Sequence, residues 1–130
     1  MIAQLTENLF LSGKDEVLDM EKLKEFNITA ILNVAYQVND PEYKDFLMVK
    51  IGLHEFSPNP DFFKDLAIIV LSTLIDNGYK VLVHCHAGAH RSPYIAFRYL
   101  AEKQNKTIDQ IYQEMMPKIP WGIIYPHQIK

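Results

Sequence analysis

The chain is 130 residues long, and 48% of its residues are hydrophobic, 22% are charged and 12% are aromatic. This composition excludes a disordered tail, a collagen-like fibre and a multidomain enzyme, and it predicts a single domain spanning residues 1–130. A domain of this size buries roughly two-thirds of the surface that its unfolded chain exposes, so it needs neither a disulfide nor a structural metal.

Cysteine use and apolar content indicate the compartment. Cys85 is the only cysteine, so the chain forms no internal disulfide and no thiolate metal cluster, and a reducing compartment is its natural environment. Residues 1–7 lack the basic start and apolar core of a signal peptide, and the longest apolar stretch, residues 66–75, is about half a membrane span. We therefore expect a cytoplasmic protein with no membrane partner.

The formal net charge of −3 is distributed unevenly. Residues 1–79 carry thirteen acidic residues and six lysines, residues 80–106 carry five basic residues and one acidic residue, and residues 107–130 balance. A nucleic-acid surface needs a broad basic face, whereas a short basic segment in an acidic chain indicates a local anion site. We expect no nucleic-acid partner, and we look for the anion site in residues 80–106.

The first half of the chain predicts two strands, a helix and a further strand. Residues 8–11 are typical of a short strand, and the apolar spacing of residues 15–26 predicts an amphipathic helix. Residues 28–34 are β-branched and apolar on both faces, as in a buried parallel strand. Residues 43–51 are expected to contain another strand.

A loop over residues 52–61 is expected to lead into a long helix. Its two prolines, Pro58 and Pro60, favour a loop, and Asp61 is expected to cap the helix that follows. Gly78 lies where a glycine commonly ends a helix.

The second half of the chain continues the alternation. Residues 80–84 predict a second buried strand, and a helix follows from about Ser92. Thr107 and Gln110 have the spacing of a capping box for a last helix to about Met116. Strands that alternate with helices predict an α/β fold with a central, mostly parallel sheet flanked by helices.

The loop between the second buried strand and its helix is suited to an oxyanion such as phosphate. Open α/β sheets bind ligands at the carboxyl ends of their strands. Gly88 permits positive φ, Ala87 and Ala89 let the backbone approach a ligand, and successive N–H groups can form an anion-binding nest. The N-terminus of the following helix adds positive potential. The expected phosphate-binding residues are His86, Ala87, Gly88, Ala89, His90 and Arg91.

Three side chains around this loop form a candidate catalytic group. A nest and a helix N-terminus favour the thiolate form of Cys85. Arg91 provides a planar fork that can hold two oxygens of a phosphoryl group and follow them into the transition state. Ser92 can donate a hydrogen bond to the Cys85 thiolate, and this bond makes the thiolate a better leaving group. We interpret these residues as a nucleophile, a phosphate clamp and a thiolate stabiliser.

The nine residues from His84 to Ser92 resemble the signature of the cysteine-dependent protein tyrosine phosphatases. Residues 81–83 before them and Pro93 after them resemble the dual-specificity branch, and residues 5–13 and 23–34 are similar to the opening of that family. The resemblance covers roughly residues 5–115.

The resemblance implies a compact fold of the protein tyrosine phosphatase type and hydrolysis of phosphate monoesters through a phosphocysteine at Cys85. It implies no cofactor, and we expect phosphorylated proteins as substrates. Phosphotyrosine alone and phosphotyrosine together with phosphoserine and phosphothreonine are both open at this point, and we disfavour lipid phosphates without excluding them. Asn33 lies in the matching opening segment, and we expect it behind the site.

The sequence departs from the family at the general acid. The family uses an aspartate before the long helix to protonate the leaving oxygen, and a carboxyl group suits that task because it can give a proton and then take one from water. Alignment on the preceding strand end puts Glu55 at that position, and Asp61 lies six residues further on. We favour Glu55 over Asp61, and the third alternative is that no general acid is present.

The histidines of the loop leave several roles open. His90 stands where the family has a smaller residue, and it either binds substrate at the pocket rim or is solvated. His86 is expected to be exposed, while His84 is expected to be buried and bonded to the backbone. Zinc bound by these histidines and Cys85 would force the loop out of its nest, so we expect no metal.

Two further interpretations remain at this point. Trp121, in the segment after the last helix, is expected to cover the core or to contact a partner, and we favour packing on the core. The missing aspartate also leaves a second function open, in which the loop and Arg91 recognise a phosphorylated partner without turnover.

Overall fold

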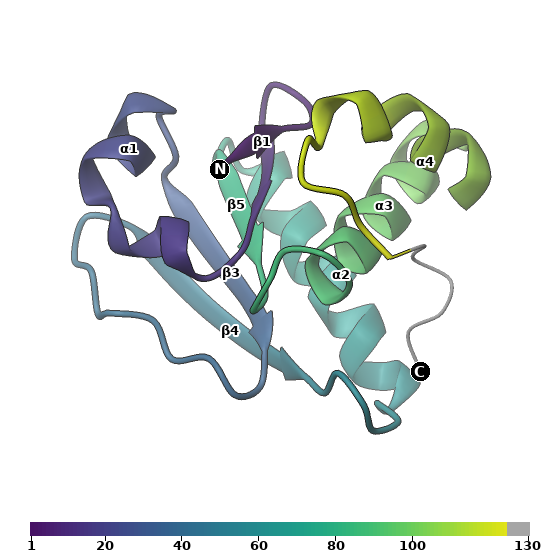
Figure 1. Ribbon diagram of the computed structural model, residues 1–130, viewed down its shortest axis with the longest axis horizontal. Coiled ribbons are helices and arrows are strands. Elements are labelled where there is room, and N and C mark those ends of the chain that lie inside the picture. The colour runs from purple at the N-terminus through teal and green to yellow at the C-terminus, as the bar shows by residue number, and fades with distance from the viewer. Residues whose placement is uncertain (125–130) are drawn as a thin grey trace.

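The computed structural model describes residues 1–124, and a five-stranded sheet between two layers of helices forms its framework (Figure 1). The elements in chain order are β1 (Ala3–Gln4), β2 (Leu9–Ser12), the 3₁₀ helix η1 (Asp15–Leu18), α1 (Met20–Glu25), β3 (Ala30–Ala35), β4 (Leu47–Leu53), α2 (Asp61–Asp76), β5 (Val81–His84), α3 (Arg91–Gln104), α4 (Ile108–Met115) and the 3₁₀ helix η2 (Met116–Lys118).

The sheet is mostly parallel, as the alternation of strands and helices predicts. Its strand order is β1-β2-β5-β3-β4, and only β1 runs antiparallel to its neighbour. Strand β5 lies between β2 and β3, and its four residues are all buried. The parallel pairing brings the carboxyl ends of β2, β5 and β3 to one edge of the sheet, with Ser12 opposite His84 and Asn33 also opposite His84.

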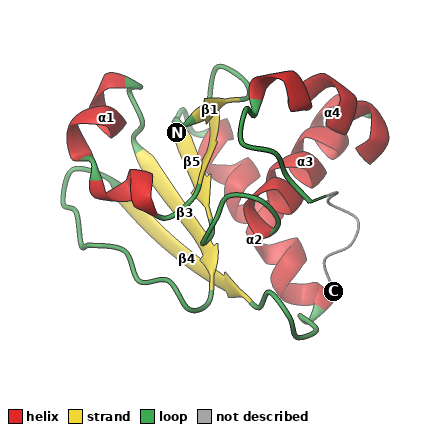
Figure 2. Cartoon of the chain, in the orientation of Figure 1, coloured by secondary structure: helices red, strands yellow, loops and turns green. Residues whose placement is uncertain are grey.

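The two faces of the sheet bury separate apolar clusters. Helices α2, α3 and α4 cover one face, and η1 and α1 cover the other (Figure 2). Along β5 the side chains alternate, so that Val81 and Val83 join the first cluster and Leu82 joins the second. Burial on both faces explains why this strand is apolar without interruption.

The expectation of one helix over residues 15–26 is wrong. The chain forms η1 and then α1, and the break lies at Asp19, whose φ of −102° and ψ of 86° are not helical. The Asp19 side chain accepts a hydrogen bond from the backbone N–H of Lys22 and caps α1. Leu18, which the helical spacing assigns to the apolar face, is 65% exposed. Local capping by Asp19 therefore outweighs the apolar periodicity.

The strand expected within residues 43–51 begins later, at Leu47, and runs on to Leu53. Tyr43 and Phe46 precede it in a loop, where their rings pack edge to face at 5.7 Å. The Tyr43 hydroxyl donates to the carbonyl of Val17 at 2.8 Å. These two aromatic residues give the loop the apolar pattern of a strand because they cover the second cluster.

The helices of the second half largely follow the sequence prediction. The capping box of Thr107 and Gln110 begins α4, and Gly78 has a φ of +87° just after α2. The cap of α2 is corrected, because Pro60 is its N-cap and Asp61 is its first helical residue. Within residues 1–124, no helix is long and apolar enough to cross a membrane.

Candidate active site

The loop from Cys85 to His90 joins β5 to α3 at the carboxyl edge of the sheet. Gly88 adopts a φ of +72°, and a Cβ on it would lie 2.8 Å from the backbone nitrogen of Gly13. A Cβ on Gly13 would in turn lie 2.9 Å from the carbonyl oxygen of His86. Both glycines are therefore needed for the loop to pack against the end of β2.

Cys85 is buried at the base of this loop, with 2% of its surface exposed. Its Sγ lies 3.2 Å from the Oγ of Ser92, a fully buried residue in the first turn of α3. The sequence predicts this pairing, and the structure brings the two atoms within hydrogen-bond distance. Helix α3 has no side chain capping its N-terminus, so the N–H groups of its first turn can serve an anion.

A pocket of about 350 Å³ opens over the Cys85 side chain. Of the residues expected to bind phosphate, all except the buried Gly88 line it. Glu55 also lines the pocket, whereas Gln37, Phe56 and Ile124 are lining residues that the sequence does not predict. The nucleophile candidate, the clamp candidate and the favoured acid candidate thus share one cavity.

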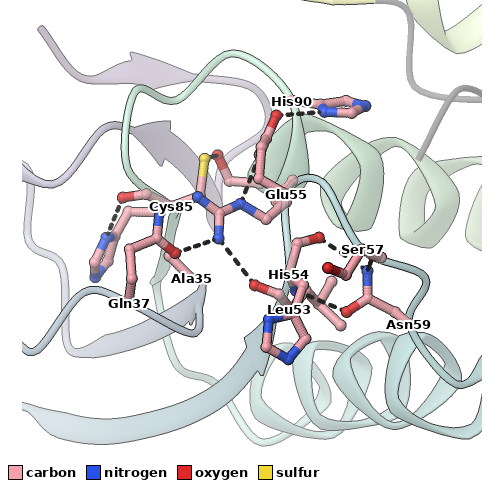
Figure 3. A network of polar contacts seen from close by, with 12 residues as sticks. Ala35, Gln37, Leu53, His54, Glu55, Ser57, Asn59, Cys85 and His90 are labelled. Atoms are coloured by element: carbon pink, nitrogen blue, oxygen red, sulfur yellow. Dashed lines mark hydrogen bonds and ion pairs between the residues drawn. The ribbon is translucent and has the colours of Figure 1, made fainter. Parts of the chain in front are cut away.

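Arg91 is almost fully buried, with 1% of its surface exposed. Its Nη1 donates to the Oε1 of Gln37 at 2.7 Å and to the carbonyl of Leu53 at 2.9 Å (Figure 3). Its Nε lies 2.8 Å from Glu55 Oε2 but is not aligned for a hydrogen bond, so this contact is an ion pair. The guanidinium plane is therefore fixed from one side while its Nε proton has no hydrogen-bond partner among the described residues.

Glu55 contacts both Arg91 and His90, and Figure 3 shows its carboxylate directed toward the His90 ring. Its second carboxylate oxygen, Oε1, is 2.7 Å from the Nδ1 of His90, whose side chain is only 12% exposed. The interpretation of His90 as a solvated side chain is therefore wrong, because His90 lines the pocket and contacts the acid candidate. His86 is exposed, as expected.

The structure does not bring Asp61 to this site. Its side chain is 93% exposed and pairs with Lys64 at 3.1 Å in the first turn of α2. It does not line the pocket over Cys85. The two acid candidates therefore differ in position, and only Glu55 contacts Arg91.

His84 is fully buried behind the nucleophile candidate. Its Nδ1 lies 3.0 Å from the carbonyl oxygen of Cys85, which confirms the expected backbone contact. Its Nε2 lies 2.8 Å from the Oδ2 of Asp40, a residue that the sequence does not single out. Both ring nitrogens are thus within hydrogen-bond distance of an oxygen, and the tautomer of the ring decides which of them donates.

Asn33 supports the site through the turn that follows β3. Its amide donates to the carbonyl of Val38 at 2.7 Å, and its Oδ1 accepts from the N–H of Ala35 at 2.9 Å. These two bonds close the turn that carries Gln37 to Arg91. Asn33 therefore acts on the guanidinium indirectly, through Gln37.

The residues that sequence reasoning missed lie in loops and tails. Gln37 and Asp40 belong to the irregular stretch between β3 and β4, where side chains show no periodicity. Trp121 is a residue that the sequence does single out, but its contact with the loop is not predicted: its Nε1–H donates to the carbonyl of Gly88 at 3.0 Å. It is also partly buried against the large apolar cluster, so the expected core packing is confirmed but incomplete.

The sequence of this chain is similar to that of known proteins. The family described as dual specificity phosphatase, catalytic domain, matches residues 9–126. Dual specificity protein phosphatase 1 of Arabidopsis thaliana is 29% identical over 118 residues, which are 89% of this chain and 59% of that protein. Dual specificity protein phosphatase 18 of Rattus norvegicus is 30% identical over 101 residues, which are 76% of this chain and 49% of that protein. The chain thus spans about half to three-fifths of these relatives.

Solved structures share the fold. Human DUSP28 superposes with a TM-score of 0.82 at 18% identity, over 98% of this chain and 85% of that one. The human tyrosine phosphatase-like serine/threonine/tyrosine-interacting protein superposes with a TM-score of 0.81 at 19% identity, over 96% of this chain and 87% of that one. At these identities the likeness establishes the fold alone.

Proposed function

The chain belongs to the dual specificity phosphatase catalytic-domain family, and on that premise we propose that it hydrolyses phosphate monoesters in proteins through a phosphocysteine at Cys85. One observation carries the proposal. The Sγ of Cys85 lies at the base of a pocket that the Arg91 guanidinium also lines, with the Ser92 hydroxyl 3.2 Å from the sulfur. A nucleophile, an oxyanion clamp and a thiolate donor thus face one centre.

In the first proposed step, the Cys85 thiolate attacks phosphorus, a sulfur–phosphorus bond forms and the bond to the leaving oxygen breaks. The N–H groups of the loop and Arg91 stabilise the charge on the phosphoryl oxygens as the bond order changes. Glu55, which must carry a proton for this step, gives it to the leaving oxygen, and the alcohol or phenol departs. A phosphoryl group that binds the Arg91 fork competes with Glu55 for Nε and so releases the carboxyl group toward the leaving group.

In the second proposed step, water attacks the phosphocysteine. Glu55, now a carboxylate, takes a proton from that water, the sulfur–phosphorus bond breaks, and inorganic phosphate leaves. The Ser92 hydroxyl, by donating to the departing thiolate, makes Cys85 a better leaving group. No metal ion enters either step.

Phosphotyrosine is the substrate we propose first, with phosphoserine and phosphothreonine as further substrates. We also propose that the protein works in the cytoplasm, since its single thiol must stay reduced to act as a nucleophile. The test is release of inorganic phosphate from a phosphotyrosyl and a phosphoseryl peptide in the presence of a chelator. Steady release from the phosphotyrosyl peptide is expected, and its absence contradicts the proposal.

The assignment of the general acid predicts a difference that depends on the leaving group. Glu55→Gln keeps a side chain that can bond to His90 but removes the transferable proton, so kcat for a phosphotyrosyl peptide should fall about 10²-fold. The first step with para-nitrophenyl phosphate should be affected far less, because its leaving group needs no protonation. Rapid-mixing kinetics with both substrates measures this difference.

Asp61→Asn is the matched control for that experiment. Because Asp61 is exposed and its ion pair is with Lys64 of the same helix, its loss should leave both rates unchanged. A large decrease in Asp61→Asn with normal rates in Glu55→Gln would reverse the assignment.

A second candidate function is phosphate recognition without turnover, and one contact favours it. Glu55 is bound by both Arg91 and His90, which is a stable place for a carboxylate that never acts as an acid. One structural neighbour is named a tyrosine phosphatase-like interacting protein. Binding of a phosphopeptide with no release of phosphate selects this function.

A further inference from the structure

The segment that follows η2 lies against the loop from Cys85 to His90, which we name the phosphate loop. We name residues 119–124 the C-terminal strap. Ile119, 2% exposed, anchors one end of the strap in the large cluster, and Lys118 just before it donates to the carbonyl of Leu5 at 2.9 Å. From there the strap, yellow in Figure 1, runs to the loop between β5 and α3.

Two neighbouring carbonyls of the phosphate loop accept hydrogen bonds from the strap. The indole Nε1–H of Trp121 donates to the Gly88 oxygen at 3.0 Å. The backbone N–H of Ile124 donates to the Ala89 oxygen at 2.6 Å. The strap therefore holds two consecutive peptide units of the loop, those that follow Gly88 and Ala89.

The direction of these carbonyls determines where the N–H groups point. A trans peptide unit is planar, and its C=O and N–H point in opposite directions. Because Trp121 holds the Gly88 carbonyl, the N–H of Ala89 is directed away from the indole, and the bond from Ile124 to the Ala89 carbonyl fixes the N–H of His90 in the same way. Ala89 and His90 both line the pocket over Cys85. An anion nest requires this convergence of N–H groups.

Two further carbonyl oxygens of the loop, those of Cys85 and His86, also contact residues outside the loop. The Cys85 oxygen contacts the ring of His84 at 3.0 Å, and the His86 oxygen accepts from the N–H of Lys14 at 2.9 Å. Residues before and after the loop thus contact four of its carbonyl oxygens. Of the residues that donate to these carbonyl oxygens, Trp121 is the only one in the described part of the strap that does so through its side chain.

We propose that Trp121 is a positioning residue for phosphate binding, because its indole N–H fixes the peptide unit that directs the Ala89 N–H into the pocket. The proposal rests on the proposed function only in that the pocket binds a phosphoryl group. It assigns Trp121 a role that packing on the core does not require. A tryptophan that served only the core would tolerate loss of its N–H as long as an aromatic ring remained.

Two substitutions separate these roles. Trp121→Phe removes the N–H and keeps an aromatic ring, and replacement of Trp121 by benzothienylalanine keeps the bicyclic shape with sulfur in place of N–H. Lys118→Met is the matched control, since it removes the hydrogen bond to Leu5 at the anchored end of the strap and leaves both bonds to the loop in place. Binding of inorganic phosphate and of orthovanadate is measured by calorimetry, and thermal unfolding is measured on each variant.

We expect both Trp121 variants to bind phosphate about fivefold to tenfold more weakly, the fold-change that one lost hydrogen bond commonly causes. KM for para-nitrophenyl phosphate should rise with it, while the unfolding temperature of the benzothienylalanine variant stays near that of the wild type. Lys118→Met should bind phosphate normally. Unchanged phosphate affinity in the benzothienylalanine variant, or equal weakening in Lys118→Met, overturns the proposal.

The same measurements keep this proposal apart from the proposed function. A wild type that binds phosphate but releases none from substrates contradicts the hydrolase, and the Trp121 comparison is still decided by affinity. A wild type that hydrolyses substrate with unaltered affinity in the Trp121 variants contradicts only the positioning role. Absence of phosphate and vanadate binding in the wild type contradicts both.

Discussion

Cys85→Ser is expected to lower hydrolysis of para-nitrophenyl phosphate by about 10⁴-fold or more, the scale seen when a covalent nucleophile is removed. A serine hydroxyl is nearly the same shape as the thiol but is not ionised by the donors of the loop. Its neighbour, Ser92, would then face a second hydroxyl in place of the sulfur that it contacts at 3.2 Å. Steady-state rates in the presence of a chelator measure the loss.

The Cys85→Ser variant also provides its own control for folding. Since the loop and Arg91 are intact, it should still bind phosphate and should unfold near the temperature of the wild type. Retention of more than a few per cent of the activity would show that Cys85 is not the nucleophile. Loss of both activity and phosphate binding would indicate a collapsed loop, and a Cys85→Ala variant then separates the two causes.

Arg91→Lys is expected to lower kcat by about 10²- to 10⁴-fold, the range for a lost oxyanion donor or a lost arginine at a transferred phosphoryl group. Lysine keeps the charge but presents a point donor instead of a planar fork. It also loses the two bonds from Nη1 to Gln37 and Leu53 that hold the guanidinium plane. The decrease should therefore appear in kcat more than in KM.

Arg98→Lys is the matched control on the same helix. Arg98 is partly exposed, contacts Tyr94 and Glu102 of the same helix and does not line the pocket over Cys85, so its substitution should leave kcat within about twofold of the wild type. If Arg91→Lys also stays within that range, the assignment of Arg91 as the phosphate clamp fails.

The loop could be predicted from the sequence because everything that shapes it is local. A buried strand, two small residues, a glycine with positive φ and a helix start follow one another within Val81 to Ser92, and the structure keeps them in that order. The parallel sheet was predictable for a similar reason, since burial on both faces leaves a continuous apolar run. The family resemblance rests on these same residues, and the family match confirms it.

The surroundings of the loop could not be predicted, because they depend on contacts between distant segments. Arg91 is held by Gln37, 54 positions earlier, and His84 by Asp40, 44 positions earlier. Trp121 reaches Gly88 across 33 positions. No periodicity marks residues in loops, so their roles follow from the fold and not from the pattern.

The helix expected over residues 15–26 shows a different limit, because here a clear sequence pattern predicts the wrong structure. Its apolar spacing favours a helix, but Asp19 accepts a backbone hydrogen bond and begins a new helix instead. Asp61 shows the same limit, because an aspartate near a helix start suits both the cap and the first turn, and the structure places it in the first turn. Short-range polar contacts decide such boundaries within one or two residues.

The phosphocysteine is tested most directly by trapping it. Glu55→Gln with para-nitrophenyl phosphate should complete the first step, whose leaving group needs no proton, and stall in the second, which lacks its base. Rapid quenching followed by peptide mass spectrometry should then find one phosphoryl group on the peptide that contains Cys85. Turnover with an unmodified Cys85, or with the phosphoryl group on another residue, would contradict the mechanism.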